Sequence, residues 1–141
     1  MPIEDTFVYK LTEQGIDEIP ARKAAQVLKY YKEVYDKDIF PPTQRIPMIW
    51  KGMIKLGIQP YINENAKDTK VPLSLKLNDL DSIATGRDLS QEQLKIYHDL
   101  DSIAIGIAVC IRKKLLATCE HTKYSITAKG VEFTETDSKN K

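Results

Sequence analysis

Residues 90–130 read SQEQLKIYHDLDSIAIGIAVCIRKKLLATCEHTKYSITAKG, and this stretch decides the fold. Ser90 stands before a polar segment, where its hydroxyl can accept hydrogen bonds from the first free amides of a helix. Gln93 lies at the third helical position and completes a capping box. A helix is therefore predicted to begin at Ser90.

Apolar residues recur at steps of three and four along this helix: Leu94, Tyr97, Leu100, Ala104, Ile107, Ile111 and Leu115. The spacing places one apolar stripe on a helix of several turns. Residues 102–111 carry no charge, and their alternation of large and small apolar side chains is also a strand pattern. We favour the helix, because the flanks are helical and the small residues at 104, 106, 108 and 110 let neighbouring backbones approach. The run is about half of the ~20 residues that a bilayer crossing needs, which predicts a core element.

The basic triplet Arg112-Lys113-Lys114 ends the predicted helix. Cations in a last turn interact favourably with the carbonyl end of the helix dipole, and the same cations could form a patch that contacts phosphates. Two short apolar runs follow, separated by Glu120-His121-Thr122-Lys123. This pattern predicts a β-hairpin with a charged tip, in which residues 124–130 form the closing strand.

The order of helix, basic residues, hairpin and Tyr-x-Ile-Thr-x-x-Gly resembles the recognition helix, wing and last strand of winged-helix DNA-binding domains, in which Tyr-x-Leu-Thr-x-x-Gly is a frequent ending. The resemblance covers residues 90–130 of the 141. It implies a mainly α fold with a small antiparallel β-sheet (α+β), a groove-facing helix at 91–114 and a wing tip at 120–123. The alternative is an α+β domain that merely closes with a hairpin.

Length and charge limit the possible partners. The 141 residues suffice for one domain with a single core, expected over residues 1–133, with a polar tail at 134–141. Twenty-one basic and 20 acidic residues leave a net charge of +1. Since no global field attracts nucleic acid or an anionic membrane, such binding would depend on a local patch.

The cysteines and the N-terminal segment bear on location. Cys110 and Cys119 are isolated thiols, and no Cys-x-x-Cys occurs, which is typical of buried cysteines in a reducing compartment. The segment Met1-Pro2-Ile3-Glu4-Asp5 lacks the apolar core of a signal peptide. A cytoplasmic protein is predicted.

Three elements are predicted in the first half of the chain. Residues 6–11 alternate as a short strand, and their ending at 9–15 repeats the Tyr-x-Leu/Ile-Thr-x-x-Gly pattern of 124–130. The two copies could share a sheet or mark a duplication, although chance recurrence is favoured. Pro20 starts a helix with an apolar face of Ala24, Val27, Leu28, Tyr31, Val34 and Tyr35. After Pro41-Pro42, Thr43 caps a second amphipathic helix that Gly57 stops, with Pro47 in its first turn.

The aromatic residues of these helices have two interpretations. Tyr30 and Tyr31 lie near lysines and arginines and could form a nucleic-acid surface, but tyrosines at this spacing are more often core or rim residues. Trp50 is interpreted as a core anchor. Residues 58–62 could form an edge strand, which Pro60 interrupts, and residues 63–70 are predicted to be a loop and hinge.

The clearest internal repeat is Asp79-Leu80-Asp81-Ser82-Ile83-Ala84-Thr85-Gly86, which recurs at 99–106 with Ile105 in place of Thr85. Paired aspartates can bind divalent cations, but no EF-hand spacing is present, so helix caps and solvated turns explain them better. The repeat could place two helices side by side, joined by residues 86–89.

No catalytic motif is present: there is no Walker loop, Gly-x-Gly-x-x-Gly, Gly-x-Ser-x-Gly or His-Glu-x-x-His. His98 and His121 could join Cys110 and Cys119 in a zinc site, but the spacing matches no zinc finger or ribbon. The chain is therefore predicted to have no enzymatic activity, cofactor or metal.

A small intracellular DNA-binding regulator of transcription, acting as a dimer, is the first hypothesis. Its phosphate contacts would come from Arg112, Lys113, Lys114, Lys123 and Lys129, with His121 near the wing tip. The second is a helical adaptor that mediates protein–protein assembly. The third is a metal-dependent enzyme that uses Asp79, Asp81, Asp99 and Asp101.

Overall fold

The computed structural model describes residues 2–63, 91–120 and 122–135, with the backbone alone at 91–94. Its elements are α1 (Ile3–Glu13), α2 (Glu18–Lys37), β1 (Thr43–Arg45), α3 (Ile46–Lys55), α5 (Gln91–Arg112), β2 (Leu116–Cys119), β3 (Lys123–Ile126) and α6 (Ala128–Thr134). The three strands form one antiparallel sheet. The predicted class, mainly α with a small antiparallel sheet, is confirmed.

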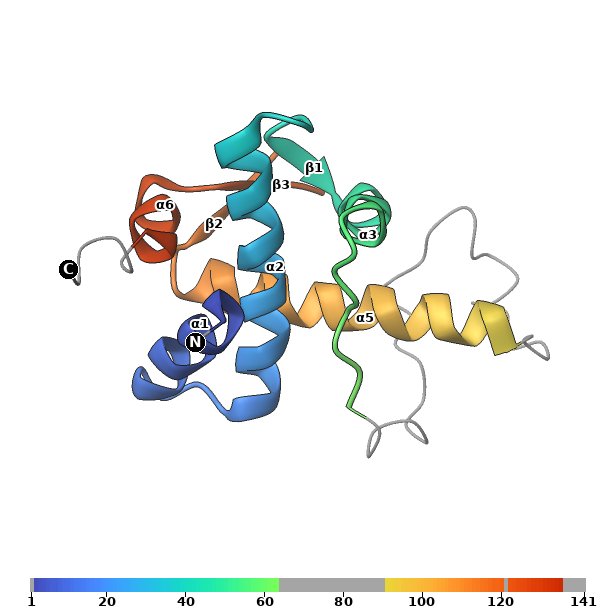
Figure 1. Cartoon of the computed structure of the whole chain (residues 1–141), viewed down its shortest axis with the longest axis horizontal. Coiled ribbons are helices and arrows are strands. Elements are labelled where there is room, and N and C mark those ends of the chain that lie inside the picture. Colours follow the sequence, from blue (N-terminus) through green and yellow to red (C-terminus); the bar gives the residue numbers. More distant parts are fainter. Residues whose placement is uncertain (1, 64–90, 121, 136–141) are drawn as a thin grey trace.

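The helix predicted over the uncharged run is α5, so the strand alternative is wrong there. Figure 1 shows α5 passing behind α2, with the sheet on one side of α5 and α1 on the other. The small residues permit the close approach that was expected: a Cβ at Gly106 would lie 2.5 Å from the carbonyl oxygen of Lys23. Cys110 Sγ lies 3.9 Å from the carbonyl oxygen of Ala24. The α2–α5 crossing is therefore the centre of the core.

The predicted face of α2 is buried except at Tyr35, which is 56% exposed. Tyr30 and Tyr31 are both buried in the core, so the interpretation of these tyrosines as a nucleic-acid surface is wrong. The helix begins at Glu18, which places Pro20 in its first turn. A missing N–H is tolerated there, because the first amides of a helix have no intrahelical partner.

The strand predicted at residues 6–11 is wrong, because this segment belongs to helix α1. Its buried residues are Phe7, Val8 and Leu11, at helical spacing, whereas Tyr9 is 60% exposed. Gly15, with φ of 92°, follows the helix. The first copy of the Tyr-x-Leu/Ile-Thr-x-x-Gly pattern thus ends a helix, and it does not share a sheet with the second copy.

The helix predicted from Thr43 begins only at Ile46, since Thr43–Arg45 is strand β1. Pro47 explains the shift: it has no N–H to donate to the carbonyl oxygen of Thr43, four residues earlier, and its ring would clash with that carbonyl in a helix, so the helix does not extend back to Thr43. Trp50 packs, partly buried, against the cluster of Tyr97 and Leu100, which agrees with its interpretation as an anchor.

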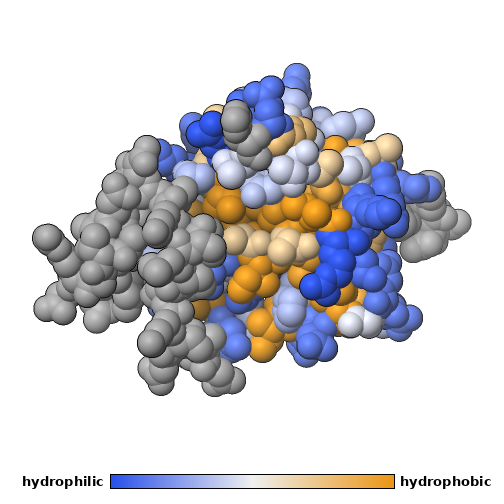
Figure 2. All heavy atoms as spheres, turned by 180° about the vertical axis from the view of Figure 1, so that it is seen from behind, coloured by the Kyte–Doolittle hydropathy of each residue, from blue (hydrophilic) through white to orange (hydrophobic). Residues whose placement is uncertain are grey.

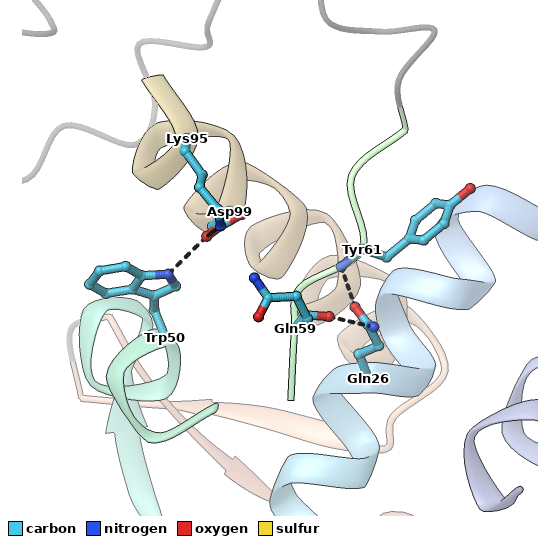
Figure 3. Close-up of polar contacts among 6 residues, drawn as sticks. All are labelled: Gln26, Trp50, Gln59, Tyr61, Lys95 and Asp99. Atoms are coloured by element: carbon cyan, nitrogen blue, oxygen red, sulfur yellow. Dashed lines mark hydrogen bonds and ion pairs between the residues drawn. The ribbon is translucent and has the colours of Figure 1, made fainter. Parts of the chain in front are cut away.

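Residues 58–63 form no strand, contrary to the expectation for 58–62. Their backbone is held instead by the side chain of Gln26, whose Nε2 donates to the carbonyl oxygen of Gln59 over 2.7 Å. Its Oε1 accepts a hydrogen bond from the Tyr61 amide (Figure 3). An edge strand would need a neighbouring strand, and here α2 supplies the hydrogen-bonding groups.

The predicted hairpin is confirmed as β2 and β3, and β1 pairs with the other edge of β3, giving the order β1-β3-β2. The closing strand predicted over residues 124–130 is too long, because β3 ends at Ile126. Thr127 is the N-cap of α6, and its Oγ1 accepts a hydrogen bond from the Gly130 amide over 2.9 Å. Thr134 ends α6 and is buried, so the helix includes the first residue of the predicted tail.

Several predictions lie outside the described residues: the loop at 64–70, the first copy of the repeat at 79–86, the junction at 86–89, the capping role of Ser90, and residues 136–141. The second copy of the repeat, 99–106, lies within α5. In the ranges that the structure describes, no helix combines the length and the apolar character that crossing a membrane requires.

Candidate nucleic-acid interface

Two cations face each other in the sheet. The antiparallel register of β1 and β3 places Arg45 directly opposite Lys123. Like charges in directly opposed positions destabilise a sheet. In the described part of the chain, neither side chain forms an ion pair with a carboxylate. Among the described residues, the sheet therefore holds a positive pair that no carboxylate compensates.

A third cation comes from α3 and completes a concave surface, which we call the basic groove. The groove encloses about 610 Å³ and is lined by Pro41, Thr43, Arg45, Pro47, Met48, Lys51 and Lys123. Arg45 and Lys51 are exposed, and Lys123 is half-buried. The described lining residues supply cations, a hydroxyl and apolar surface but no carboxylate, so their chemistry suits an anion.

Strand alternation explains why the cations point outward. Gln44 and Tyr124 form the neighbouring cross-strand pair, and they face the opposite side of the sheet from Arg45 and Lys123. Gln44 is 1% exposed, and its Oε1 accepts a hydrogen bond from Tyr30 Oη over 2.6 Å. Its Nε2 donates to the carbonyl oxygen of Pro41 over 2.7 Å. Gln44 thereby fixes β1, and with it the direction of Arg45.

Tyr31 holds the second strand of the groove. Its Oη donates to the carbonyl oxygen of Tyr124 over 2.6 Å. Burial raises the pKa of both Tyr30 and Tyr31, so each phenol stays protonated and able to donate. Two core tyrosines of α2 thus anchor the two strands that carry Arg45 and Lys123.

The start of α3 adds to the positive potential of the groove. Its N-cap residue, Arg45, makes no side-chain capping hydrogen bond, and no acidic residue lies in the first turn. Pro47 and Met48 of that turn line the groove. Helix N-termini carry partial positive charge, which no carboxylate offsets in this turn.

The predicted cation triplet lies at the other end of the hairpin. Leu116 pairs with Ile126 near that end, whereas Cys119 pairs with Lys123 near the tip. Arg112 and Lys114 are exposed there, and Lys113 Nζ donates to the carbonyl oxygen of Gln14 over 3.3 Å. The triplet is therefore separated from Lys123 by the length of the hairpin.

The remaining predicted phosphate contacts are Lys123, Lys129 and His121. Lys129 is exposed in the first turn of α6, after the strand end that lies near the triplet. His121 lies outside the described residues. Of the six predicted contacts, the structure places Lys123 in the basic groove, while Arg45 and Lys51 were not predicted. The sequence does not indicate these two residues, because it predicts one helix from Thr43 to Gly57, and a helix has no strand partner that would place Arg45 opposite another cation.

The candidate metal ligands have other partners. Asp99 is 1% exposed, and its Oδ2 accepts hydrogen bonds from Trp50 Nε1 over 3.2 Å and Lys95 Nζ over 3.1 Å (Figure 3). Burial raises the pKa of Asp101, although Lys23 and His98 oppose this shift. Within residues 2–63, 91–120 and 122–135, no group of three or more His, Cys, Asp or Glu side chains could hold a metal ion. Asp79, Asp81 and His121 lie outside these ranges.

Comparison of the chain with protein-family models, with curated protein sequences and with solved structures gave no match.

Proposed function

We propose that this protein binds duplex DNA through the phosphate backbone, as an intracellular regulator of transcription. One observation carries the proposal: Arg45 lies directly opposite Lys123, beside Lys51, in a groove whose described lining contains no carboxylate. A cross-strand pair of like charges lowers stability unless an anion neutralises it. A row of phosphates supplies such anions at close spacing.

The arrangement of the elements supports the same proposal. A hairpin follows a long helix, and β3 pairs with β1, which directly precedes α3. This order is compatible with the winged-helix resemblance, with residues 120–123 at the wing position. The free thiols of Cys110 and Cys119 are typical of the reducing interior of a cell.

The chemistry of the lining favours duplex over single-stranded nucleic acid. Proteins that bind single strands stack bases on aromatic side chains, and none of the described residues that line the basic groove is aromatic. The C-terminal half of α5 presents Ala104, Ile105 and Ala108 outward, which lack the hydrogen-bonding groups that read base edges. Contacts to phosphates position a protein without specifying sequence. We therefore expect weak sequence preference from the described residues alone.

Charge reversal in the groove tests the proposal. Arg45→Glu and Lys51→Glu should each weaken binding to a labelled duplex at least tenfold at low salt, which is about 1.4 kcal/mol. Each should also lower the slope of log K against log salt by about 0.9, because one phosphate contact is lost. Fluorescence anisotropy over a salt series measures both quantities. Lys37→Glu, an equal charge change at the end of α2, is the matched control and should bind like the wild type.

A double variant tests the basic triplet Arg112-Lys113-Lys114. If the duplex also reaches the far end of the hairpin, the double variant Lys113→Glu/Lys114→Glu will lower the slope of log K against log salt as well. Equal binding by the wild type and the groove variants, or no detectable duplex binding at low salt, would refute the proposal.

A protein-binding adaptor is the alternative, and a separate surface favours it. Tyr35 and Ile39 are 56% and 44% exposed. Tyr35 also lines a mainly apolar cavity of about 210 Å³ with Tyr31, Val34, Asp38, Phe40, Pro42 and Ile126. Exposed apolar residues around a pocket are typical of protein interfaces. Under this alternative, a protein partner would co-purify with the chain even after nuclease treatment. Tyr35→Asp would abolish this co-purification, and Arg45→Glu would leave the co-purification unchanged.

A further inference from the structure

The C-terminal half of α5 is apolar on every side, yet one side faces the surface. Residues 102–111 contain no charge. Gly106 and Cys110 face α2. On the other side, Ala108 is exposed and Ile105 is half-buried, while Ala104 is half-buried at the edge where it packs against the cluster of Tyr97 and Leu100. Since a helix that is hydrophobic all round is normally buried, this sequence demands more burial than the described residues of one copy provide.

The surface view agrees with the burial pattern. Figure 2 shows the molecule from behind, the side on which α5 lies relative to α2 in Figure 1. A band of hydrophobic side chains crosses this face at the height of α5, bordered by hydrophilic residues. Contiguous apolar surface with a polar border marks an interaction site. We call the residues Asp101, Ala104, Ile105, Ala108 and Arg112 the outer face of α5.

We infer that the outer face of α5 binds a second copy of this chain, with the two α5 helices packed antiparallel across a two-fold axis. The five residues lie at steps of three and four, so they share one side of the helix. An axis that crosses between residues 106 and 107 relates Ile105 to Ala108 of the second copy. Large side chains then meet small ones, which lets the helices approach closely.

The charges at the two ends of the outer face select this partner and this direction. Asp101 lies at one end and Arg112 at the other, and the same axis relates Asp101 to Arg112 of the second copy. Arg112 is exposed and forms no ion pair with a described residue. A parallel arrangement would instead bring like charges together. Self-complementary surfaces of this kind form closed two-fold dimers.

Analytical ultracentrifugation over a wide range of concentrations, without DNA, tests the inference independently of the proposed function. The wild type should show a reversible monomer–dimer equilibrium. Ala108→Arg should raise the dimer dissociation constant at least tenfold, because it puts a bulky cation on each side of the axis. Its folding should be unaffected, because Ala108 is exposed. Ile54→Arg, at an exposed apolar residue of α3, is the matched control and should dimerise like the wild type.

A charge swap tests the antiparallel direction. Arg112→Asp should weaken the dimer, because two aspartates then face each other, and the double variant with Asp101→Arg should restore it. Thermal unfolding of each variant verifies that it is folded, since Asp101 lies near Lys23 and His98. A wild type that stays monomeric at every concentration, an Ala108→Arg variant that dimerises normally, or a folded double variant without restored affinity would overturn the inference.

Discussion

Gly106 of α5 lies against the main chain of Lys23 in α2, and a Cβ at this position would come within 2.5 Å of the Lys23 carbonyl oxygen. The obstacle is backbone, which cannot rotate away as a side chain can. Gly106→Ala should therefore lower the free energy of unfolding by about 1–3 kcal/mol, the usual cost of overpacking, despite the higher helix propensity of alanine. Denaturant titration measures the change. Ala108→Ser, on the opposite side of α5, should change it by less than about 0.5 kcal/mol.

Thr127 connects α6 to the end of α5. Its Oγ1 accepts from the Gly130 amide and donates to the carbonyl oxygen of Lys114 over 2.7 Å. Thr127→Ala should cost about 1–2 kcal/mol of stability, because a helix cap is lost, whereas Thr127→Ser should keep most of it. Equal stability of the alanine and serine variants in urea would show that the hydroxyl has no such role.

Tyr30 and Gln44 form a buried hydrogen bond between α2 and β1. Tyr30→Phe leaves the side-chain oxygen Oε1 of Gln44 without this donor, so we expect the free energy of unfolding to fall by about 1–3 kcal/mol. Tyr35→Phe is the control, because Tyr35 is 56% exposed, and it should leave the unfolding midpoint unchanged. If duplex binding depends on the position of Arg45, Tyr30→Phe should also weaken it at temperatures where the variant is folded.

Buried tyrosines make the protein sensitive to alkali. Burial raises the pKa of Tyr31 above its ordinary value of 10.0. A raised pKa in the folded state stabilises the fold below the unfolded value, and this contribution decreases as the pH rises above 10.0. Ultraviolet titration should therefore show Tyr31 ionising together with loss of helical circular dichroism. In Tyr31→Phe, the increase in tyrosinate absorbance that accompanies unfolding should be smaller by the contribution of one tyrosine.

The two cysteines should differ in reactivity. Cys110 is fully buried in the core and burial raises its thiol pKa, so little thiolate forms and reagents cannot reach it. Cys119 is half-buried in β2, near Ser125 Oγ. Under native conditions a thiol reagent should modify Cys119 alone, and Cys110 should react only after denaturant has unfolded the protein. Rapid native modification of Cys110 in a Cys119→Ser variant would contradict this packing.

The elements that the sequence predicted well are those with local causes. The stripe on α5 and the face of α2 follow helical spacing, and the hairpin follows from two short apolar runs around a polar tip. The segment at 6–11 misled because Phe7, Tyr9 and Leu11 alternate, although Val8 and not Tyr9 is buried. Over so few residues the two periods cannot be separated from the sequence alone.

The Thr-x-x-Gly pattern shows how one sequence can serve two structures. In the second copy, Thr127 caps α6, and the absence of a Cβ at Gly130 lets the helix lie against the carbonyl oxygen of Leu115. In the first copy, Thr12 Oγ1 donates to the carbonyl oxygen of Tyr9 and Gly15 adopts a positive φ. Both uses suit the same residue types, so the pattern alone does not predict which end of a helix it marks.

The basic groove could not be predicted, because it depends on a long-range register. Arg45 becomes significant only when β1 pairs with β3 and places it opposite Lys123. That pairing joins segments on either side of residues 64–90, and no local pattern encodes it. Lys51 was visible in the sequence as one more surface lysine, and only the groove distinguishes it from the others.

This pairing makes the basic groove, the proposed anion-binding surface, a property of the completed fold. During synthesis β1 emerges long before β3, so a nascent chain that ends between them has no groove. An anion that contacts Arg45 and Lys123 together holds the early and late strands in register, and its occupancy should therefore raise the melting temperature of the entire domain.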